Sequence, residues 1–362
     1  MKHKKHKKLT KPYQGNFGRN EWSIIGTTCA NIQELAQKVS SNLGEYKIAY
    51  LDASHSANEG HDSNFYLRYT DNSGVHQFST KGDFNKWQLR PYFHEADMLL
   101  INGNHFQGVR QIVVIDSKKE ISLSKKLDRL TDVGLVLLKD CNQVYEFLNE
   151  KIEGVPILNF DDTHGIAHFL RKQIRKPELF GLLLMGGKST RMGRDKGLID
   201  YHGKPQREYA ADLLSVHTTK TFLSCRADQV EDTDSAFELL SDTFLGLGPY
   251  GGILSAFQQH PNKAWLVMAV DLPKMDKEGI QELVNGRNIS KIATAFLNPE
   301  SQFPEPLITI WEPKSYPILL DFLAQGFSCP RKVLINSDIQ MLTSKHPEKL
   351  MNVNSPSDLD GF

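Results

Sequence analysis

Short apolar runs alternate with amphipathic stretches along most of the chain from Trp22 onward. In the first half, the apolar runs predict strands at residues 22–28, 47–55, 96–103, 111–116, 133–140 and 155–162, and helical spacing predicts helices at 31–43 and 163–174. Residues 57–90 are polar and irregular, except that Asp71-Asn72-Ser73-Gly74 is typical of a hairpin turn. This alternation predicts a mostly parallel sheet with helices on its faces.

The same alternation starts again after Arg-Lys-Pro-Glu at residues 175–178, whose charge and proline are typical of a linker. The second half predicts strands at residues 179–185, 220–225, 237–242, 264–271, 291–296 and 305–311, and helices at 206–217, 252–260, 277–286 and 315–326. We therefore predict an α/β protein of two domains, each a mostly parallel sheet flanked by helices.

Length and composition fit this organisation and narrow the function. The chain has 362 residues, of which 40% are hydrophobic and 24% are charged, as expected for two globular domains. Lysine plus arginine and aspartate plus glutamate both number 43, so no basic excess favours nucleic acid as a partner. No apolar run approaches the ~20 residues that span a bilayer, and no secretory signal is visible.

The cysteines and the N-terminal residues indicate an ordinary intracellular protein. Cys29, Cys141, Cys225 and Cys329 are widely spaced, which fits neither a zinc knuckle nor a disulfide framework. A reduced, cytoplasmic protein is the simplest interpretation. Residues 1–20 are predicted to form a disordered basic tail, because a charge run such as MKHKKHKK is usually solvated.

The most informative motif is LLLMGGKSTRMGRDKG at residues 182–197, where an apolar strand runs into a glycine pair and a cationic turn. Glycine lets backbone N–H groups approach a phosphate closely, and Gly186 and Gly187 stand at that place. Arg191 and Lys196 would offset the phosphate charge. A glycine pair alone would favour a tight turn with incidental surface charge, whereas the full spacing from Gly186 to Lys196 favours phosphate binding.

The pattern L-x-G-G-x-S-x-R-M-G-x-D-K in this motif resembles the molybdenum cofactor guanylyltransferases, and it differs from a Walker loop. Three further blocks follow in the family's order. GLGPYGGILSAF (246–257) is similar to the family's GPLAGI segment, AWLVMAVDLP (264–273) to its strand ending in C-D-x-P, and NVNSPSDL (352–359) to its terminal NVNTPEDL. The resemblance covers residues 177–362 and implies a Rossmann-like nucleotidyltransferase domain.

The resemblance also implies roles for the matching residues. Lys196 and Arg191 would act on the triphosphate, and Asp271 would bind Mg²⁺ at the carboxyl end of a buried strand, although a helix N-cap is the alternative for Asp271. Asn354 would approach the same metal. The nucleotide would be bound by Leu184, Met185, Gly186, Gly187, Lys196, Ser224, Asp242, Gly248 and Gly251.

Base selectivity depends on the same loop. Gly186 stands where related cytidylyltransferases carry alanine, which leaves room for a purine and favours GTP over CTP. Met185 replaces the small alanine of the family and would narrow the base pocket. Tyr250 replaces a leucine and would either stack on a ligand or fill space, and Val270 replaces a cysteine as neutral packing.

The implied reaction is attack of the terminal phosphate of molybdopterin on the α-phosphorus of Mg-GTP, with release of pyrophosphate. Two alternatives stay open: a nucleotidyltransferase with another acceptor, of cytidylyl or sugar-phosphate type, and a non-catalytic factor that delivers a nucleotide or cofactor. The implied partners are GTP, a molybdopterin-type acceptor, and molybdoenzyme apoproteins or other cofactor-synthesis proteins. Homo-oligomerisation is left open, and neither nucleic acid nor a membrane is expected.

Residues 21–176 resemble, in strand order, the P-loop adaptor protein that partners these guanylyltransferases. Here the adaptor's loop GxxxSGKTT is replaced by IIGTTCANIQEL at residues 24–35, which keeps Gly26 and lacks the lysine. The resemblance implies a degenerate nucleotide loop and a scaffold, a dimerisation unit, or a module that docks a pterin or an apoenzyme. Asp52 would be a remnant of the adaptor's site or an ordinary cap, and the loop histidines His55, His61, His94 and His105 are expected to be solvated.

Overall fold

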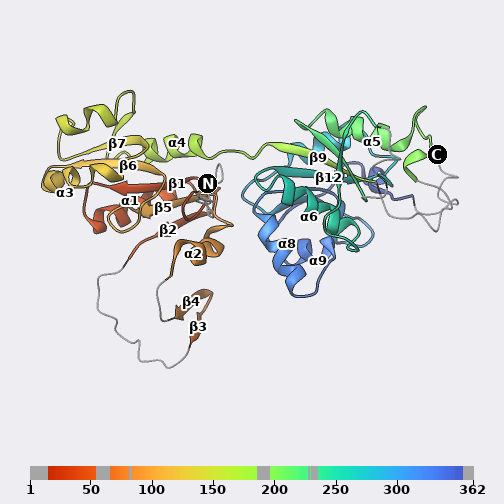
Figure 1. Cartoon of the computed structure of the whole chain (residues 1–362), viewed down its shortest axis with the longest axis horizontal. Coiled ribbons are helices and arrows are strands. Elements are labelled where there is room, and N and C mark those ends of the chain that lie inside the picture. The colour runs from red at the N-terminus through yellow and green to blue at the C-terminus, as the bar shows by residue number, and fades with distance from the viewer. Residues whose placement is uncertain are drawn as a thin grey trace, which may run out of the picture. The chain divides into compact units, whose positions relative to one another are not determined.

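The computed structural model describes residues 15–53, 66–80, 84–185, 196–226, 229 and 235–353. The chain divides into two compact units, Met1–Arg175 and Lys176–Phe362. Each unit is a sheet with helices on both faces (Figure 1), which confirms the predicted α/β class. Within the described ranges, no helix has the length and apolar character needed to cross a membrane.

Six parallel strands form the sheet of the first unit. Their order is β2 (Ile48–Leu51), β5 (Met98–Asn102), β1 (Glu21–Ile25), β6 (Arg110–Asp116), β7 (Val133–Lys139) and β8 (Ile157–Asn159). Successive side chains of a strand point to opposite faces of the sheet, so the strands contribute side chains to two hydrophobic cores, one on each face. One core is covered by α1 (Cys29–Ser41) and α4 (Thr163–Gln173). The other is covered by α3 (Glu120–Ser124) and the 3-10 segments η1 (Ser117–Lys119), η2 (Leu127–Arg129) and η3 (Glu146–Lys151).

The polar stretch between β2 and β5 contains more structure than the sequence pattern predicts. β3 (Leu67–Asn72) and β4 (Val75–Thr80) form the expected hairpin, and Ser73 and Gly74 have the positive φ values of 54° and 93° that such a turn requires. α2 (Lys86–Phe93) was not expected, because it buries no residue and contains a proline. A capping box starts it: the Asn85 side chain accepts from Gln88 N at 3.2 Å, and Gln88 Oε1 accepts from Asn85 N at 3.0 Å.

Seven strands form the sheet of the second unit. Their order is β11 (Glu238–Ser241), β10 (Thr221–Cys225), β9 (Leu179–Leu184), β12 (Ala264–Ala269), β14 (Pro304–Trp311), β13 (Ala293–Leu297) and β15 (Gln340–Leu342). β14 runs antiparallel to β12 and β13, and the remaining pairs are parallel. The prediction of a mostly parallel sheet is therefore confirmed.

The helices of the second unit cover its two sheet faces. One core contains residues of α6 (Pro249–Gln259), α8 (Ser315–Ala324) and α9 (Pro330–Ile335), and the other contains residues of α5 (Gln206–Ser215) and α7 (Lys277–Asn285). The 3-10 segments η4 (Lys196–Leu198) and η6 (Pro347–Leu350) complete the unit. The sequence pattern did not predict α9 and β15, because six and three residues are too short to show a period.

Candidate active site

The connections of the second sheet diverge at its carboxyl edge. The chain leaves β9 towards β10 on one side and later returns to β12 on the other side of β9. Open α/β sheets bind ligands where the connections diverge in this way. The glycine-lysine motif follows β9 in the sequence. Val270 N donates to Leu184 O at 3.1 Å, which ties the ends of β9 and β12 together. Gly186, Gly187, Arg191 and Asn354 lie outside the described residues.

Asp271 and Lys196 come together at this edge, although they are far apart in the sequence. Lys196 Nζ lies 3.9 Å from Asp271 Oδ2, and each side chain is 20% exposed. The same ammonium donates to the Val353 carbonyl at 2.8 Å, and Val353 N donates to Asp271 O at 2.9 Å. The segment before Asn354 is therefore fixed to both charged residues, and sequence reasoning missed the part played by Val353.

The Asp271 carboxylate is largely buried and is only partly paired. Its Oδ1 atom is buried and has no hydrogen-bond partner among the described residues. Burial raises the pKa of Asp271, and the Lys196 charge partly opposes that change. A buried carboxylate oxygen without a donor fits Mg²⁺, which takes one or two protein carboxylates and completes its shell with phosphate and water. The alternative of a helix cap is wrong, because the N-cap of α7 is Asp276.

Ser224 near the end of β10 and Asp242 directly after β11 form a second polar pair. Ser224 Oγ donates to Asp242 Oδ1 at 2.7 Å, and Asp242 N donates to Cys225 O at 2.9 Å. Burial raises the pKa of Asp242, whereas the hydrogen bond from Ser224 lowers it. The pair thus holds a positioned carboxylate at the carboxyl edge of the sheet.

Glycines bring the start of α6 against this pair. Gly248 takes the N-cap position with φ 55°, a conformation that favours glycine. A Cβ on Gly251 would lie 2.2 Å from the Phe244 carbonyl. Gly252, which sequence reasoning missed, has the closest relation to the pair, because its Cβ would lie 2.7 Å from Ser224 Oγ and 2.8 Å from Leu184 Cδ2. Its place as the third glycine of the GPYGG block (248–252) was its only sequence signal.

Gly252→Ala is expected to disturb the Ser224–Asp242 pair directly. The added methyl group must displace Ser224 Oγ, so we expect a loss of about 1–3 kcal/mol in unfolding free energy from overpacking. We also expect nucleotide affinity to fall about tenfold, since a displaced hydrogen bond is worth roughly that factor. Thermal unfolding and nucleotide titration measure both effects. Gly44→Ala is the control, because its Cβ would meet nothing closer than 3.9 Å; equal behaviour of the two variants would contradict the assignment.

The residues that depart from the family pattern pack in the core. Met185 packs against the core on the α5 and α7 side of the sheet, whereas Leu184 belongs to the core on the α6 side, where Gly252 meets the polar pair. Tyr250 is fully buried and donates its hydroxyl to Leu319 O at 2.7 Å, so it fills space. Val270 is buried in the same core as Met185.

The first unit also has a polar cluster at the carboxyl edge of its sheet. His105 Nε2 lies 3.3 Å from Cys29 Sγ and 3.9 Å from Asp52 Oδ1, and the His105 side chain is only 17% exposed. The expectation that this histidine is solvated is therefore wrong. Asp52 accepts from Tyr50 OH at 2.7 Å and from Asn102 Nδ2 at 2.8 Å, so it belongs to a network rather than to an isolated cap. His55 and His61 lie outside the described residues.

Comparisons with known proteins concern mainly the second unit. Residues 181–339 match the family of the MobA-like NTP transferase domain. The molybdenum cofactor biosynthesis bifunctional protein of Synechocystis sp. is 34% identical over 189 residues, which are 52% of this chain and 54% of that protein. The chain thus spans about half the length of that relative. A probable molybdenum cofactor guanylyltransferase of Nostoc sp. is 30% identical over 50% of this chain and 88% of its own length.

Two solved structures are similar at a lower level. Molybdopterin-guanine dinucleotide biosynthesis protein A of Archaeoglobus fulgidus is 22% identical with a TM-score of 0.44, over 50% of this chain and 95% of its own. Bacillus subtilis MobB is 18% identical with a TM-score of 0.32, over 43% of this chain and 98% of its own. Likenesses this remote decide nothing on their own. The similarity in sequence shows the family: through its second unit, the chain belongs to the molybdenum cofactor guanylyltransferase family of nucleotidyltransferases.

Proposed function

We propose that the chain transfers GMP from GTP to the terminal phosphate of molybdopterin and releases pyrophosphate. The observation that carries the proposal is the buried Asp271 carboxylate, with one oxygen lacking a hydrogen-bond donor among the described residues and with the Lys196 ammonium 3.9 Å from the other. Family membership supports the choice of reaction, since the Nostoc relative is named a probable molybdenum cofactor guanylyltransferase.

The residues of this site would bind and orient the two substrates. Lys196 would neutralise triphosphate charge while Val353 O holds its ammonium in place. Asp242, oriented by Ser224, would accept N–H donors of the guanine. Mg²⁺ bound at Asp271 would supply charge neutralisation for the triphosphate and the leaving pyrophosphate. Catalysis would rest on positioning and electrostatics, without a covalent protein intermediate.

The other residues of the sequence motifs would contribute to binding of the nucleotide and of the metal. Gly186 and Gly187 would bring backbone N–H groups to the phosphates, with Leu184 and Met185 leading into that loop, and Arg191 would add a second cation. Asn354 would join Asp271 at the metal, since it directly follows Val353. Gly248 and Gly251 would let the start of α6 approach the nucleotide.

Ser224→Ala is expected to change how nucleotide binding depends on pH. The Ser224 hydrogen bond lowers the pKa of Asp242, so its loss raises that pKa further. An ionised carboxylate is the better acceptor for guanine N–H groups. As the pH is lowered, the GTP affinity of the variant should therefore begin to fall at a higher pH than the GTP affinity of the native chain. Titrations between pH 5 and 8 test this, with the exposed Ser215→Ala as control; superimposable profiles for Ser224→Ala and native protein would contradict it.

Calorimetry with GTP and with CTP, each with and without Mg²⁺, tests the proposal at the level of binding. We expect GTP to bind in a Mg²⁺-dependent manner and at least tenfold more tightly than CTP. Preference for CTP would contradict the choice of base. Tight GTP binding without any turnover in the presence of molybdopterin would favour a delivery factor.

We further propose that the first unit is an adaptor-like domain without NTP hydrolysis. The segment 24–35, which joins β1 to α1, lacks the P-loop lysine. Gly26 lies so close to β6 that a Cβ would meet Val114 O at 2.2 Å. The cluster of Cys29, Asp52 and His105 fills part of the same edge. Absence of GTPase activity in a chain carrying Asp271→Asn would support this role, and hydrolysis by that variant would overturn it.

A further inference from the structure

Arg331 near the start of α9 pairs with Glu305 near the start of β14, and the two side chains differ in exposure. The Glu305 side chain is 7% exposed, whereas that of Arg331 is 39% exposed. Removing a carboxylate from water is costly, and buried ion pairs often add little net stability. The pair is therefore better explained by what the accessible arginine binds than by the stability of the fold.

The carboxylate of this pair is firmly held, whereas the guanidinium keeps unused hydrogen-bonding capacity. The Asn298 amide donates to Glu305 Oε1, and Asn298 Oδ1 accepts from Glu300 N at 2.9 Å and Ser301 N at 2.7 Å. Arg331 Nη2 lies 3.6 Å from Glu305 Oε2, which is beyond hydrogen-bond distance. Since arginine has five N–H donors, the guanidinium is positioned by charge and can still donate to a ligand.

The register of the second sheet carries this pair to the edge at which Asp271 lies. In the antiparallel ladder of β12 and β14, Met268 pairs with Ile308. Asp271 follows Met268 by three positions, and Glu305 precedes Ile308 by three. The end of β12 and the start of β14 therefore lie at the same edge of the sheet. α9, which carries Arg331, shares one core with α6 on one face of that sheet (Figure 1).

The strand order separates this pair from the residues proposed to contact the base. Ser224 and Asp242 belong to β10 and the end of β11, on one side of β12, and β14 with Glu305 lies on the other side. In phosphoryl transfer, the attacking and leaving groups lie on opposite sides of the phosphorus. A nucleotide bound over β9 to β11, with its metal at Asp271, thus leaves the β14 side to the acceptor.

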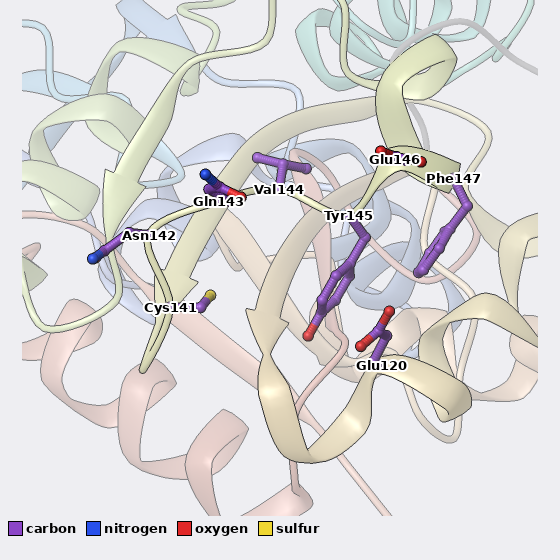
Figure 2. Close-up of a pocket in the computed structure, with 8 residues that line it drawn as sticks. All are labelled: Glu120, Cys141, Asn142, Gln143, Val144, Tyr145, Glu146 and Phe147. Carbon is purple, nitrogen blue, oxygen red and sulfur yellow. The ribbon is translucent and has the colours of Figure 1, made fainter.

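The open pocket of the first unit does not suit the reacting end of such an acceptor. This pocket of about 740 Å³ lies beside the segment 141–147 (Figure 2). Its described lining includes the carboxylates of Glu120 and Glu146 and neither lysine nor arginine. Like charges repel, so a phosphate is disfavoured there, whereas the guanidinium fork of Arg331 matches phosphate oxygens.

We propose that Arg331 binds the attacking phosphate of the acceptor, a phosphate monoester, and that Glu305 and Asn298 position its guanidinium. The identity of the acceptor as molybdopterin rests on the proposed function. The positive charge of Arg331 offsets the repulsion between this phosphate and the triphosphate. One acceptor oxygen then forms a bond to the α-phosphorus while the bond to pyrophosphate breaks, and Arg331 exchanges no bond with either substrate.

Steady-state kinetics with molybdopterin and GTP varied separately test the inference. Arg331→Ala should raise the KM for molybdopterin at least tenfold and leave the KM for GTP within twofold, since hydrogen bonds between charged groups are the strong ones. Arg331→Lys should recover part of the loss, because it restores the charge without the fork. An unchanged KM for molybdopterin in Arg331→Ala, or a parallel rise of both KM values, would overturn the assignment.

Lys332→Ala is the matched control, because it removes the same charge from the next residue of α9. The Lys332 ammonium lies over the Phe327 ring, 5.3 Å from its centroid. Both KM values of this variant should stay within twofold of the native chain. An equal rise of the KM for molybdopterin in Lys332→Ala and Arg331→Ala would show a general effect of charge and would overturn the specific contact.

A double variant separates binding from stability. Arg331→Ala leaves the Glu305 carboxylate buried and unpaired, which is destabilising. Adding Glu305→Gln removes that charge, so the midpoint of thermal unfolding should return towards the native value while the KM for molybdopterin stays raised. Return of both quantities to native values would show that the pair is purely structural.

Binding of molybdopterin to Asp271→Asn, measured by equilibrium dialysis, separates this inference from the proposed function. In this background, binding should depend on Arg331 and not on Lys332. Such binding without GMP transfer by the native chain would support the acceptor site and contradict the proposed function. Transfer by the native chain, together with binding that does not depend on Arg331, would overturn the acceptor site alone. Absence of both binding and transfer would overturn both.

Discussion

Asp271→Asn is expected to lower GMP transfer by at least about a thousandfold, which is the scale of losing a central electrostatic element. The native carboxylate offers a buried oxygen that no described donor satisfies, and the neutral amide cannot bind Mg²⁺ comparably. The fold should persist, because the amide has the same shape and removes a charge that burial disfavours. Steady-state turnover across Mg²⁺ concentrations, together with thermal unfolding, measures both parts.

Asp276→Asn is the matched control for that experiment. Asp276 lies five positions further along, caps α7 by accepting from Gly279 N at 3.0 Å, and pairs with Lys349 at 2.7 Å. Its replacement keeps the cap, because asparagine caps a helix about as well as aspartate, and weakens only the partly exposed pair with Lys349, so the unfolding free energy should fall by less than about 1 kcal/mol and transfer should stay within about twofold. If Asp276→Asn removed transfer while Asp271→Asn retained it, the metal site would be wrongly placed.

Lys196→Ala is expected to reduce kcat/KM by roughly a hundredfold to a thousandfold, in line with removal of one charge from a transition state of phosphoryl transfer. The ammonium is held by Val353 O at 2.8 Å and faces Asp271 at 3.9 Å, so its position is fixed before the nucleotide binds. Lys196→Arg should restore little, because a planar guanidinium cannot replace a compact ammonium in this geometry.

Lys204→Ala provides the control for a lost surface cation. Lys204 pairs with Asp212, and the two side chains are 38% and 53% exposed, so the pair contributes little to stability. Transfer by this variant should match the native rate. A comparable loss in Lys196→Ala and Lys204→Ala would indicate a general electrostatic effect instead of a specific triphosphate contact.

The sequence predicted the strands and helices whose hydrophobic residues recur at a regular spacing. The buried strands β9 and β12 and the helices between them follow from apolar patterning, and the strand ends place Leu184 and Asp271 at one edge of the sheet. Lys196 could be chosen because it stands at a fixed spacing from the glycine pair. α2 escaped prediction because it buries no side chain, so no apolar period marks it.

The contacts that sequence reasoning missed join distant segments. Lys196 and Val353 are 157 positions apart, and a backbone carbonyl leaves no signature in a sequence. Gly252 matters because of its distance to Ser224 across the sheet edge, which spacing alone does not reveal. Tyr250 was open to two interpretations until the packing showed that its side chain belongs to the core, and Met185 packs against the core on the other face of the sheet.

The most direct test of the central claim is to incubate the full chain with Mg²⁺, purified molybdopterin and GTP, and to measure pyrophosphate together with the dinucleotide product. The account predicts one pyrophosphate released for each guanine dinucleotide formed, no release without molybdopterin, and much slower turnover with CTP. Release of pyrophosphate that does not depend on molybdopterin, or faster turnover with CTP, would contradict it.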